Sequence, residues 1–265
     1  MLSLLLHELQ LYAPVEIAGR LVFAHLDTGA SLDVAFAVGE GIAEEDGEAP
    51  IRGAIGEVQL RRGRVAEVNF LGETLRDLPV LISPGLELRK VPLPVMLRFG
   101  GPTLLRRSLL LDFKGLRIAY QGLPDDVPRT TAPLTLAKGV PFFTLEVGGR
   151  SLRAALDIGA GITTVNAAHA GEWLAQAEIA YDTPATDPTG QTRMVPVGVL
   201  RSLRVGEVSL GDTEYLTWDL SPIEEKLGTR LDIVLGLNTM LSSSTVWALD
   251  TEAGRLEVTR RGLPG

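Results

Sequence analysis

The sequence contains no cysteine, only three histidines, and few aromatic residues (5%). Without cysteine the chain cannot form disulfide bonds, thiolate metal sites or a cysteine nucleophile. His7, His25 and His169 are too scattered along the chain to predict a metal site, and we expect none. The sequence also has no phosphate-binding loop or dinucleotide fingerprint, so we expect no cofactor.

The chain also lacks an excess of positive charge and any long apolar run. Its formal net charge is −8 and its pI is near 5.0, which argues against a nucleic-acid partner. No segment reaches the ~18 apolar residues that a membrane-spanning helix needs. The apolar start Met1–Leu6 has no basic region and is read as a strand rather than a signal peptide. These features predict a cytoplasmic protein that binds no membrane.

Short apolar runs broken by glycine turns dominate the chain, and helical periodicity is scarce. The pattern predicts hairpins over residues 65–82, turning at Leu71-Gly72-Glu73, and over residues 199–218, turning at Gly211-Asp212. The acidic stretch Gly41–Pro50 is interpreted as a solvated loop. Helices are predicted only at 167–177 and 223–227. With 45% hydrophobic residues, this is the composition of an all-β protein with substantial cores.

The most informative feature of the chain is an internal repeat. Residues 24–31, Ala-His-Leu-Asp-Thr-Gly-Ala-Ser, correspond to residues 154–161, Ala-Ala-Leu-Asp-Ile-Gly-Ala-Gly. Asp27 and Asp157 are 130 positions apart, and the similarity extends upstream without a gap, from 15–20 to 145–150. Each half should therefore deliver one aspartate at the end of a hairpin strand.

The two halves also end alike, and a linker separates them. Residues 111–118, which begin Leu-Asp, match residues 249–258, which begin with the same pair. Between the halves, a proline-rich stretch has no hydrophobic periodicity. The sequence thus predicts an N-terminal lobe over residues 1–122, a linker over 123–133 and a C-terminal lobe over 134–265.

The run Asp-Thr-Gly-Ala-Ser directly after a hairpin strand resembles the active-site loop of aspartic proteases, the retropepsin-like and pepsin-like group. A second signature of that group, two apolar residues and then glycine, is present as Ile233-Val234-Leu235-Gly236 and, in degraded form, as Leu97-Arg98-Phe99-Gly100. The resemblance covers nearly all of both halves. It implies two similar retropepsin-like β-barrel lobes, with an active-site cleft between them.

The chemistry that the repeat suggests can also be argued from the residues alone. Gly29 and Gly159 allow the two loops to approach each other where a Cβ would clash. Two adjacent carboxylates cannot both ionise easily, so they share one proton. The ionised aspartate can then activate a water while the protonated one polarises a carbonyl. Asp27 and Asp157 are therefore the candidate catalytic residues.

Two positions depart from the family pattern. Ile158 stands where the family has a threonine or serine that braces the opposite loop, so only Thr28 can brace here. We therefore expect Ile158→Thr to raise activity, thermal stability or both, because the hydroxyl restores the second half of the brace. If the site has repacked around Ile158, the change destabilises the protein instead. Ala30 and Ala160 follow the glycines without a hydroxyl, which favours a dyad that works at a less acidic pH than pepsin's.

Flap-like glycine-containing segments follow each aspartate at a similar distance. Gly53-Ala54-Ile55-Gly56 resembles the tip of a retropepsin flap, and Gly190 lies in the corresponding segment of the second half. Such hairpin tips can close over a peptide, although plain surface hairpins would have the same sequence.

The sequence favours an aspartic endopeptidase that acts on a peptide or protein substrate as a monomer. One alternative is a catalytically inactive pseudoprotease that binds peptides, which Ile158 and the arginine at position 98 support. The other is a homodimer formed through the terminal strands, since retropepsins pair in that way.

Overall fold

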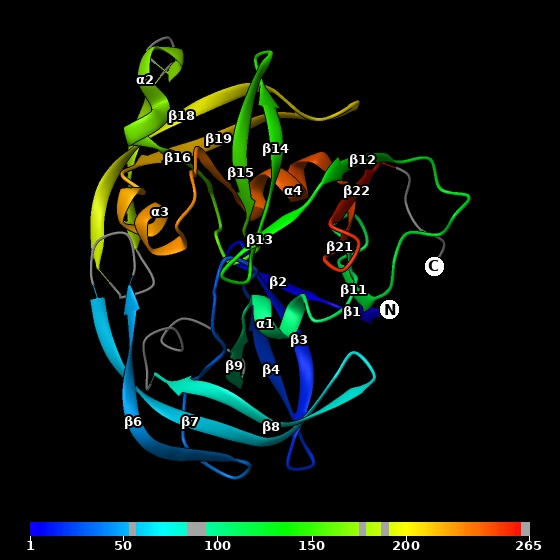
Figure 1. Cartoon of the computed structure of the whole chain (residues 1–265), viewed down its shortest axis with the longest axis vertical. Coiled ribbons are helices and arrows are strands. Elements are labelled where there is room, and N and C mark those ends of the chain that lie inside the picture. The colour runs from blue at the N-terminus through cyan, green and yellow to red at the C-terminus, as the bar shows by residue number, and fades with distance from the viewer. Residues whose placement is uncertain (53–56, 84–93, 175–178, 187–190, 261–265) are drawn as a thin grey trace.

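The computed structural model describes residues 1–52, 57–83, 94–174, 179–186 and 191–260. These residues form two eight-stranded sheets, one in each half of the chain, and a six-stranded sheet that contains strands of both halves. In Figure 1 the first lobe, in blue and cyan, lies below the second, in green to orange. The predicted all-β, two-lobed fold is therefore confirmed. Among the described residues no helix has the length and apolar character needed to cross a membrane.

The sheet of the first lobe begins with the hairpin that carries the first aspartate. In spatial order its strands are β2 (Leu5–His7), β3 (Gln10–Ile17), β4 (Arg20–Leu26), β9 (Val95–Phe99), β5 (Val34–Ala35), β8 (Glu73–Ile82), β7 (Glu57–Phe70) and β6 (Ile42–Arg52). An additional pairing of β3 with β7 curls the sheet towards a barrel.

The sheet of the second lobe repeats this order strand for strand. Its members are β13 (Thr135–Ala137), β14 (Val140–Val147), β15 (Arg150–Leu156), β20 (Ile233–Leu235), β16 (Thr163–Asn166), β19 (Val208–Trp218), β18 (Thr192–Val205) and β17 (Ile179–Thr186). The pairing of β14 with β18 corresponds to that of β3 with β7. The internal repeat of the sequence is thus a repeat of topology.

The six-stranded sheet joins the two lobes. Its strands, in spatial order, are β1 (Leu2–Ser3), β11 (Arg117–Tyr120), β10 (Leu109–Asp112), β21 (Val246–Asp250), β22 (Arg255–Thr259) and β12 (Thr130–Pro133). The matching ends of the two halves pair directly, with Leu111 opposite Trp247. Trp247 is fully buried and belongs to a core that includes residues of both lobes. This shared core fixes how the lobes face each other. β12 lies within the predicted linker, and the lobe boundaries stay a prediction.

Four helices are described, all of them short. They are α1 (Gly101–Leu104), α2 (Ala167–Leu174), α3 (Ser221–Leu227) and α4 (Leu237–Ser243). The predicted helix at 167–177 corresponds to α2, which is interrupted at Gly171 (φ 43°), and its last three residues lie outside the description. The predicted helix at 223–227 begins two residues earlier as α3, with Pro222 near its start. α1 and α4 were not predicted, and each follows one of the apolar-glycine signatures.

The loop predicted at Gly41–Pro50 is wrong, because most of it is strand β6. Its acidic residues face arginines of the neighbouring strand β7: Arg61 lies 2.6 Å from Glu44 and Arg64 lies 2.6 Å from Glu45. Opposite charges on adjacent strands stabilise a sheet, so a run that looks like a solvated loop by composition is stable as an exposed strand here.

The hairpin turn predicted at Leu71-Gly72 is confirmed, but the one predicted at Gly211-Asp212 is wrong. β18 and β19 are instead joined at Gly206-Glu207, and Gly211 lies inside β19 at a register shift opposite Leu203. Its φ of 85° suits an irregularity of that kind. A glycine in a strand marks either a turn or a bulge, and sequence alone favoured the wrong one.

Candidate active site

The two aspartates occupy equivalent positions in the two lobes. Asp27 follows the last residue of β4, and its amide donates to the carbonyl of Phe99 on β9 at 2.9 Å. Asp157 follows β15 in the same way, and its amide donates to the carbonyl of Leu235 on β20 at 3.1 Å. In both lobes the parallel neighbour strand therefore holds the start of the aspartate loop.

The structure brings the two loops into direct contact. The amide of Gly29 donates to Oδ1 of Asp157 across the lobes at 3.2 Å. A Cβ at Gly29 would lie 2.7 Å from that oxygen, and a Cβ at Gly159 would lie 2.6 Å from Oδ1 of Asp27. Only glycine permits this approach at either position.

Backbone amides orient each carboxylate within its own loop. Ala30 donates to Oδ1 of Asp27 at 2.9 Å. Gly159 and Ala160 donate to Oδ1 of Asp157 at 2.8 and 3.2 Å. All six residues that the sequence singled out around the two aspartates thus lie at one place, between the lobes.

The aspartates interact as a pair that shares a proton. Burial raises the pKa of Asp157 from its ordinary 3.8 to about 8, and the negative charge of Asp27 and a hydrogen bond between the two carboxyl groups act in the same direction. The amides of Gly159 and Ala160 oppose this shift because they stabilise the carboxylate. At neutral pH the pair therefore retains a proton, which it can donate.

Thr28 braces the site from the first lobe. This fully buried residue donates its hydroxyl to the carbonyl of Leu156 at 2.8 Å and accepts from the amide of Ile158 at 3.1 Å. The brace is one-sided, as expected, because Ile158 has no hydroxyl to return it. Ile158 is itself fully buried and belongs to the main hydrophobic core.

The sequence favoured a gain from Ile158→Thr, but Ile158 is packed in the core, and we now expect the change to destabilise the protein. The change removes buried apolar surface and places a hydroxyl among apolar groups, at a cost of about 1–3 kcal/mol. Thermal unfolding of wild type and variant measures the effect. A higher melting temperature together with faster turnover would mean that the missing half of the brace still has a place in the structure.

Two charged residues of the site were not recognised as site residues from sequence. Arg98, which the sequence showed only as a defect in the apolar-glycine signature, lies with Nε 3.6 Å from Oδ2 of Asp27. Asp33 is buried and accepts hydrogen bonds from the amide of Gly100 at 2.7 Å and from the hydroxyl of Thr103 at 2.8 Å. Burial raises the pKa of Asp33 to about 6, against these hydrogen bonds and the charge of Arg98.

The second lobe has uncharged residues at both of these places. Thr163 follows Asp157 by the same number of residues as Asp33 follows Asp27. Its hydroxyl accepts from the amide of Gly236, as Asp33 accepts from Gly100. Val234 directly precedes Leu235, whose carbonyl accepts from the amide of Asp157. Arg98 directly precedes Phe99, whose carbonyl accepts from the amide of Asp27. The sequence signal for Asp33 and Arg98 was thus that the second half of the repeat has uncharged residues at the equivalent positions.

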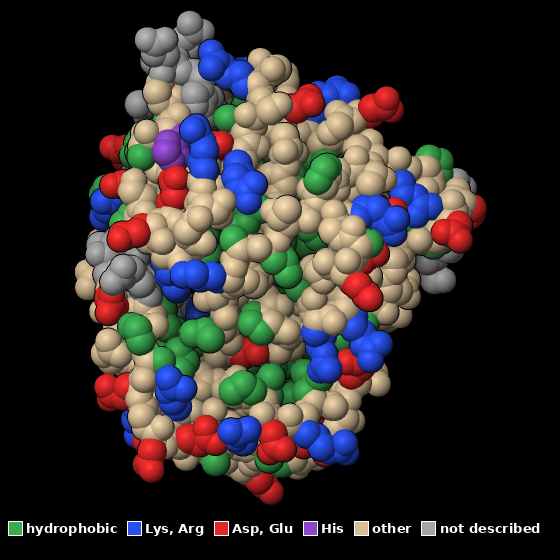
Figure 2. All heavy atoms as spheres, viewed as in Figure 1, with side chains coloured by type: hydrophobic (Ala, Val, Ile, Leu, Met, Phe, Trp, Pro, Cys, Tyr) green, Lys and Arg blue, Asp and Glu red, His purple; other side chains and the backbone are tan. Residues whose placement is uncertain are grey.

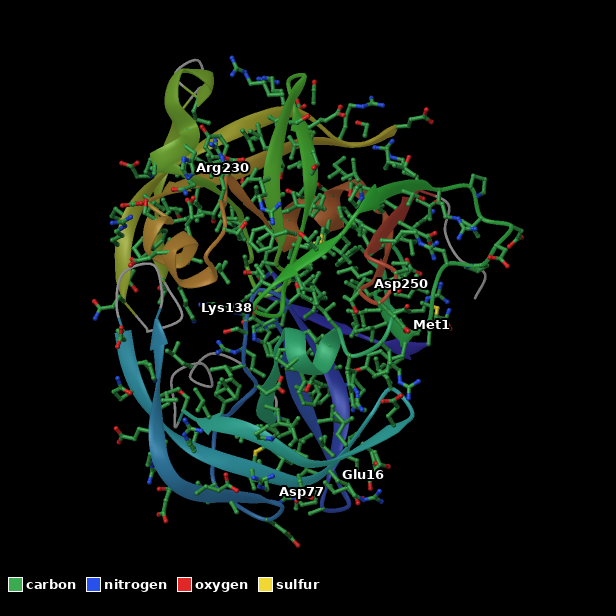
Figure 3. All side chains as sticks on the ribbon, in the orientation of Figure 1. Met1, Glu16, Asp77, Lys138, Arg230 and Asp250 are labelled. Atoms are coloured by element: carbon green, nitrogen blue, oxygen red, sulfur yellow. The ribbon has the colours of Figure 1, made fainter. Side chains whose placement is uncertain are left out.

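Two cavities flank the dyad, and both are lined by the two aspartates and Arg98. The smaller, of about 150 Å³, has mostly apolar walls: Leu32, Ile51, Val140, Ile223, Leu227 and Leu231. Lys226 also lines it, at the end of α3, where Lys138 donates to the carbonyl of Lys226. Figure 3 labels Lys138 beside α3, on the side that faces the first lobe. Figure 2 shows hydrophobic side chains gathered in the band between the lobes, bordered by charged ones.

The larger cavity, of about 570 Å³, shares Ile223 and Val234 with the smaller one besides the two aspartates and Arg98. Its walls combine apolar and hydroxyl-bearing residues: Ile162, Thr164, Thr183, Leu216, Trp218 and Leu220. Both cavities therefore open onto the two aspartates.

The candidate flap residues cannot be placed. Gly53, Ala54, Ile55, Gly56 and Gly190 all lie outside the described residues. Within the ranges that the structure describes, no group of three or more histidine, aspartate or glutamate side chains is arranged to hold a metal ion.

Comparison with known proteins places the fold. No protein-family model matches the sequence, and no curated protein does either. The structure is similar to the crystal structure of an aspartic proteinase from Irpex lacteus, with a TM-score of 0.61 and 12% sequence identity. The match covers 97% of this chain and 96% of that protein. At this identity the similarity shows a shared fold over nearly the whole length of both chains.

Proposed function

We propose that the protein is an aspartic endopeptidase, which hydrolyses peptide bonds with a water activated between Asp27 and Asp157. The observation that carries the proposal is the direct contact of the two aspartate loops, in which the amide of Gly29 donates to Oδ1 of Asp157 across the lobes. Burial and the charge of Asp27 raise the pKa of Asp157 there. Such a pair offers a base and an acid at one place and at the same pH.

In the first step, the Asp27 carboxylate takes a proton from the water as the water oxygen attacks the carbonyl carbon of the scissile bond. Asp157 donates its proton to the carbonyl oxygen. The product is a neutral gem-diol with a new C–O bond, and the proton of the dyad has moved to Asp27.

In the second step, the C–N bond breaks and the leaving amine takes the proton from Asp27. One hydroxyl of the gem-diol returns a proton to Asp157 as the carboxylic acid forms. The dyad is restored, and the net reaction consumes one water. No cofactor is required, and the protein supplies the position of the water and the unequal protonation of the carboxyls.

The proposed substrate is an extended peptide or protein segment. The two cavities that adjoin the dyad can accept the side chains that flank the scissile bond, and apolar residues suit the walls of the smaller one. Because both aspartates belong to one chain, the proposed active form is a monomer. A homodimer through the terminal strands is the alternative.

Incubation with a mixed peptide library in water enriched in heavy oxygen tests the proposal. We expect cleavage within the peptides and one heavy oxygen atom in each new C-terminal carboxyl group, read by mass spectrometry. Intact peptides at every pH at which the protein stays folded would overturn it.

An inactive peptide-binding protein remains the second candidate function. Two observations favour it: the one-sided brace at Ile158 and the guanidinium of Arg98 beside a catalytic aspartate. The same library distinguishes the two functions, because a binding protein would retain peptides without shortening them.

A further inference from the structure

The two halves of the dyad differ in their electrostatic surroundings. Arg98 of β9 lies next to Asp27, and Val234 occupies the equivalent place beside Asp157. The side chains of Arg98 and Asp27 are only 8% and 13% exposed. Water therefore screens their attraction weakly, and the effect on the dyad is larger than that of a surface ion pair.

Other charged or titratable groups surround Arg98, and several share the cavities beside it. His25 lies in register with Arg98 on β4, and Asp33 directly precedes β5, which pairs with β9. Glu8 and Asp157 line the larger cavity together with Arg98. Lys226 lines the smaller one. Of these groups, Asp33 interacts electrostatically with Arg98 through the attraction that opposes its raised pKa.

On the basis of the proposed function, we infer that Arg98 is a positioning residue that decides which aspartate is the base. Its guanidinium attracts the negative charge of the dyad to Asp27, so the shared proton resides on Asp157 when substrate binds. Arg98 then contributes to the function of the site and is not evidence for an inactive protein.

The sign of the effect on pH dependence follows from the charge of Arg98. A nearby positive charge stabilises every form of the dyad that has lost a proton, so the dyad loses both of its protons at lower pH than it would otherwise. Removing the charge should therefore move both limbs of the pH profile of kcat/KM upwards. An opposite charge at this distance typically shifts an ionisation by about 1–3 pH units.

Arg98→Met tests the inference, with Arg98→Lys as the matched variant that keeps the charge. We expect both limbs of the Arg98→Met profile to move upwards by about 1–3 pH units, and the Arg98→Lys profile to keep limbs near those of wild type. Equal limbs in wild type and Arg98→Met would overturn the inference. A loss of affinity for acidic peptides with unchanged limbs would also overturn it, since Arg98 would then bind substrate.

A readout without substrate separates this inference from the proposed function. Isotope-labelled aspartate carboxyl carbons report the titration of the dyad by NMR, with Asp27→Asn and Asp157→Asn for assignment. If wild type cleaves no peptide, the proposed function fails, but a displaced dyad titration in Arg98→Met still supports the role of Arg98. An undisplaced titration overturns that role.

A second variant covers the case in which Arg98→Met does not fold. Arg98→Val combined with Asp33→Thr introduces the residues that the second lobe has at the equivalent places, Val234 and Thr163. Comparison with Asp33→Thr alone isolates the charge of Arg98. The same upward displacement is expected, and coinciding titrations of the two variants would overturn the inference.

Discussion

Replacing Asp157 with asparagine is expected to reduce peptide cleavage by about 10²–10⁴-fold, to the background of the assay, because the variant cannot donate a proton to the carbonyl oxygen. Asp27→Asn should be equally inactive, because it lacks the base that activates the water. The measurement is the initial rate of cleavage of one library-derived peptide by wild type and both variants. Activity near that of wild type in either variant would show that the dyad does not carry the reaction.

The pH dependence of stability provides a control that Asp157→Asn is folded. The pKa of Asp157 is raised on folding to about 8, so the folded state binds this proton more tightly than the unfolded state does. The resulting stabilisation is complete below an ordinary carboxyl pKa and is lost as the pH rises towards 8. Asp157→Asn cannot lose this proton. We therefore compare the free energy of unfolding of Asp157→Asn with that of wild type in acid and above pH 8. The difference in favour of the variant should be larger above pH 8, by a few kcal/mol.

Thr28→Val is expected to have the largest effect on stability among single changes at the site. It removes a buried hydroxyl that accepts from the amide of Ile158 and donates to the carbonyl of Leu156, both in the other lobe. With each of the two lost hydrogen bonds costing about 1–3 kcal/mol, the free energy of unfolding should fall by about 2–6 kcal/mol. Turnover should fall too, by about 10²-fold, if the carboxyls move apart by about 1 Å.

Thr28→Ser is the matched control, because it keeps the hydroxyl and loses only a methyl group. Urea unfolding of the three proteins measures stability, and the rate of peptide cleavage measures the alignment of the dyad. If Thr28→Val unfolds at the same urea concentration as wild type, the hydroxyl is not a brace between the lobes.

The repeat made much of the fold and the centre of the site predictable. A matched Asp-Xaa-Gly at equivalent places in two halves predicted two similar lobes and the meeting of Asp27 with Asp157. The glycines were predictable for the same reason, since each loop lies against the aspartate side chain of the other lobe, where a Cβ would clash. What recurs in both halves could be read from sequence because each copy supports the interpretation of the other.

The features that the sequence did not reveal depend on contacts between distant segments. The ends of the two halves were seen to match, but not that β10 and β21 pair with each other in one sheet. The acidic strand β6 resembled a loop until the arginines of β7 were seen opposite it. Arg98 looked like a departure from a pattern, because its contact with Asp27 comes from the pairing of β9 with β4 and not from local sequence. Asp33 was not singled out at all.

The most direct test of the account is a high-resolution crystal structure that shows the water on the dyad. A water activated by both carboxyls should lie about 2.6–3.2 Å from one oxygen of Asp27 and from one oxygen of Asp157. Carboxyl groups more than about 8 Å apart, each hydrogen-bonded within its own lobe and with no shared water, would contradict the account, because no single water could then reach both within hydrogen-bonding distance.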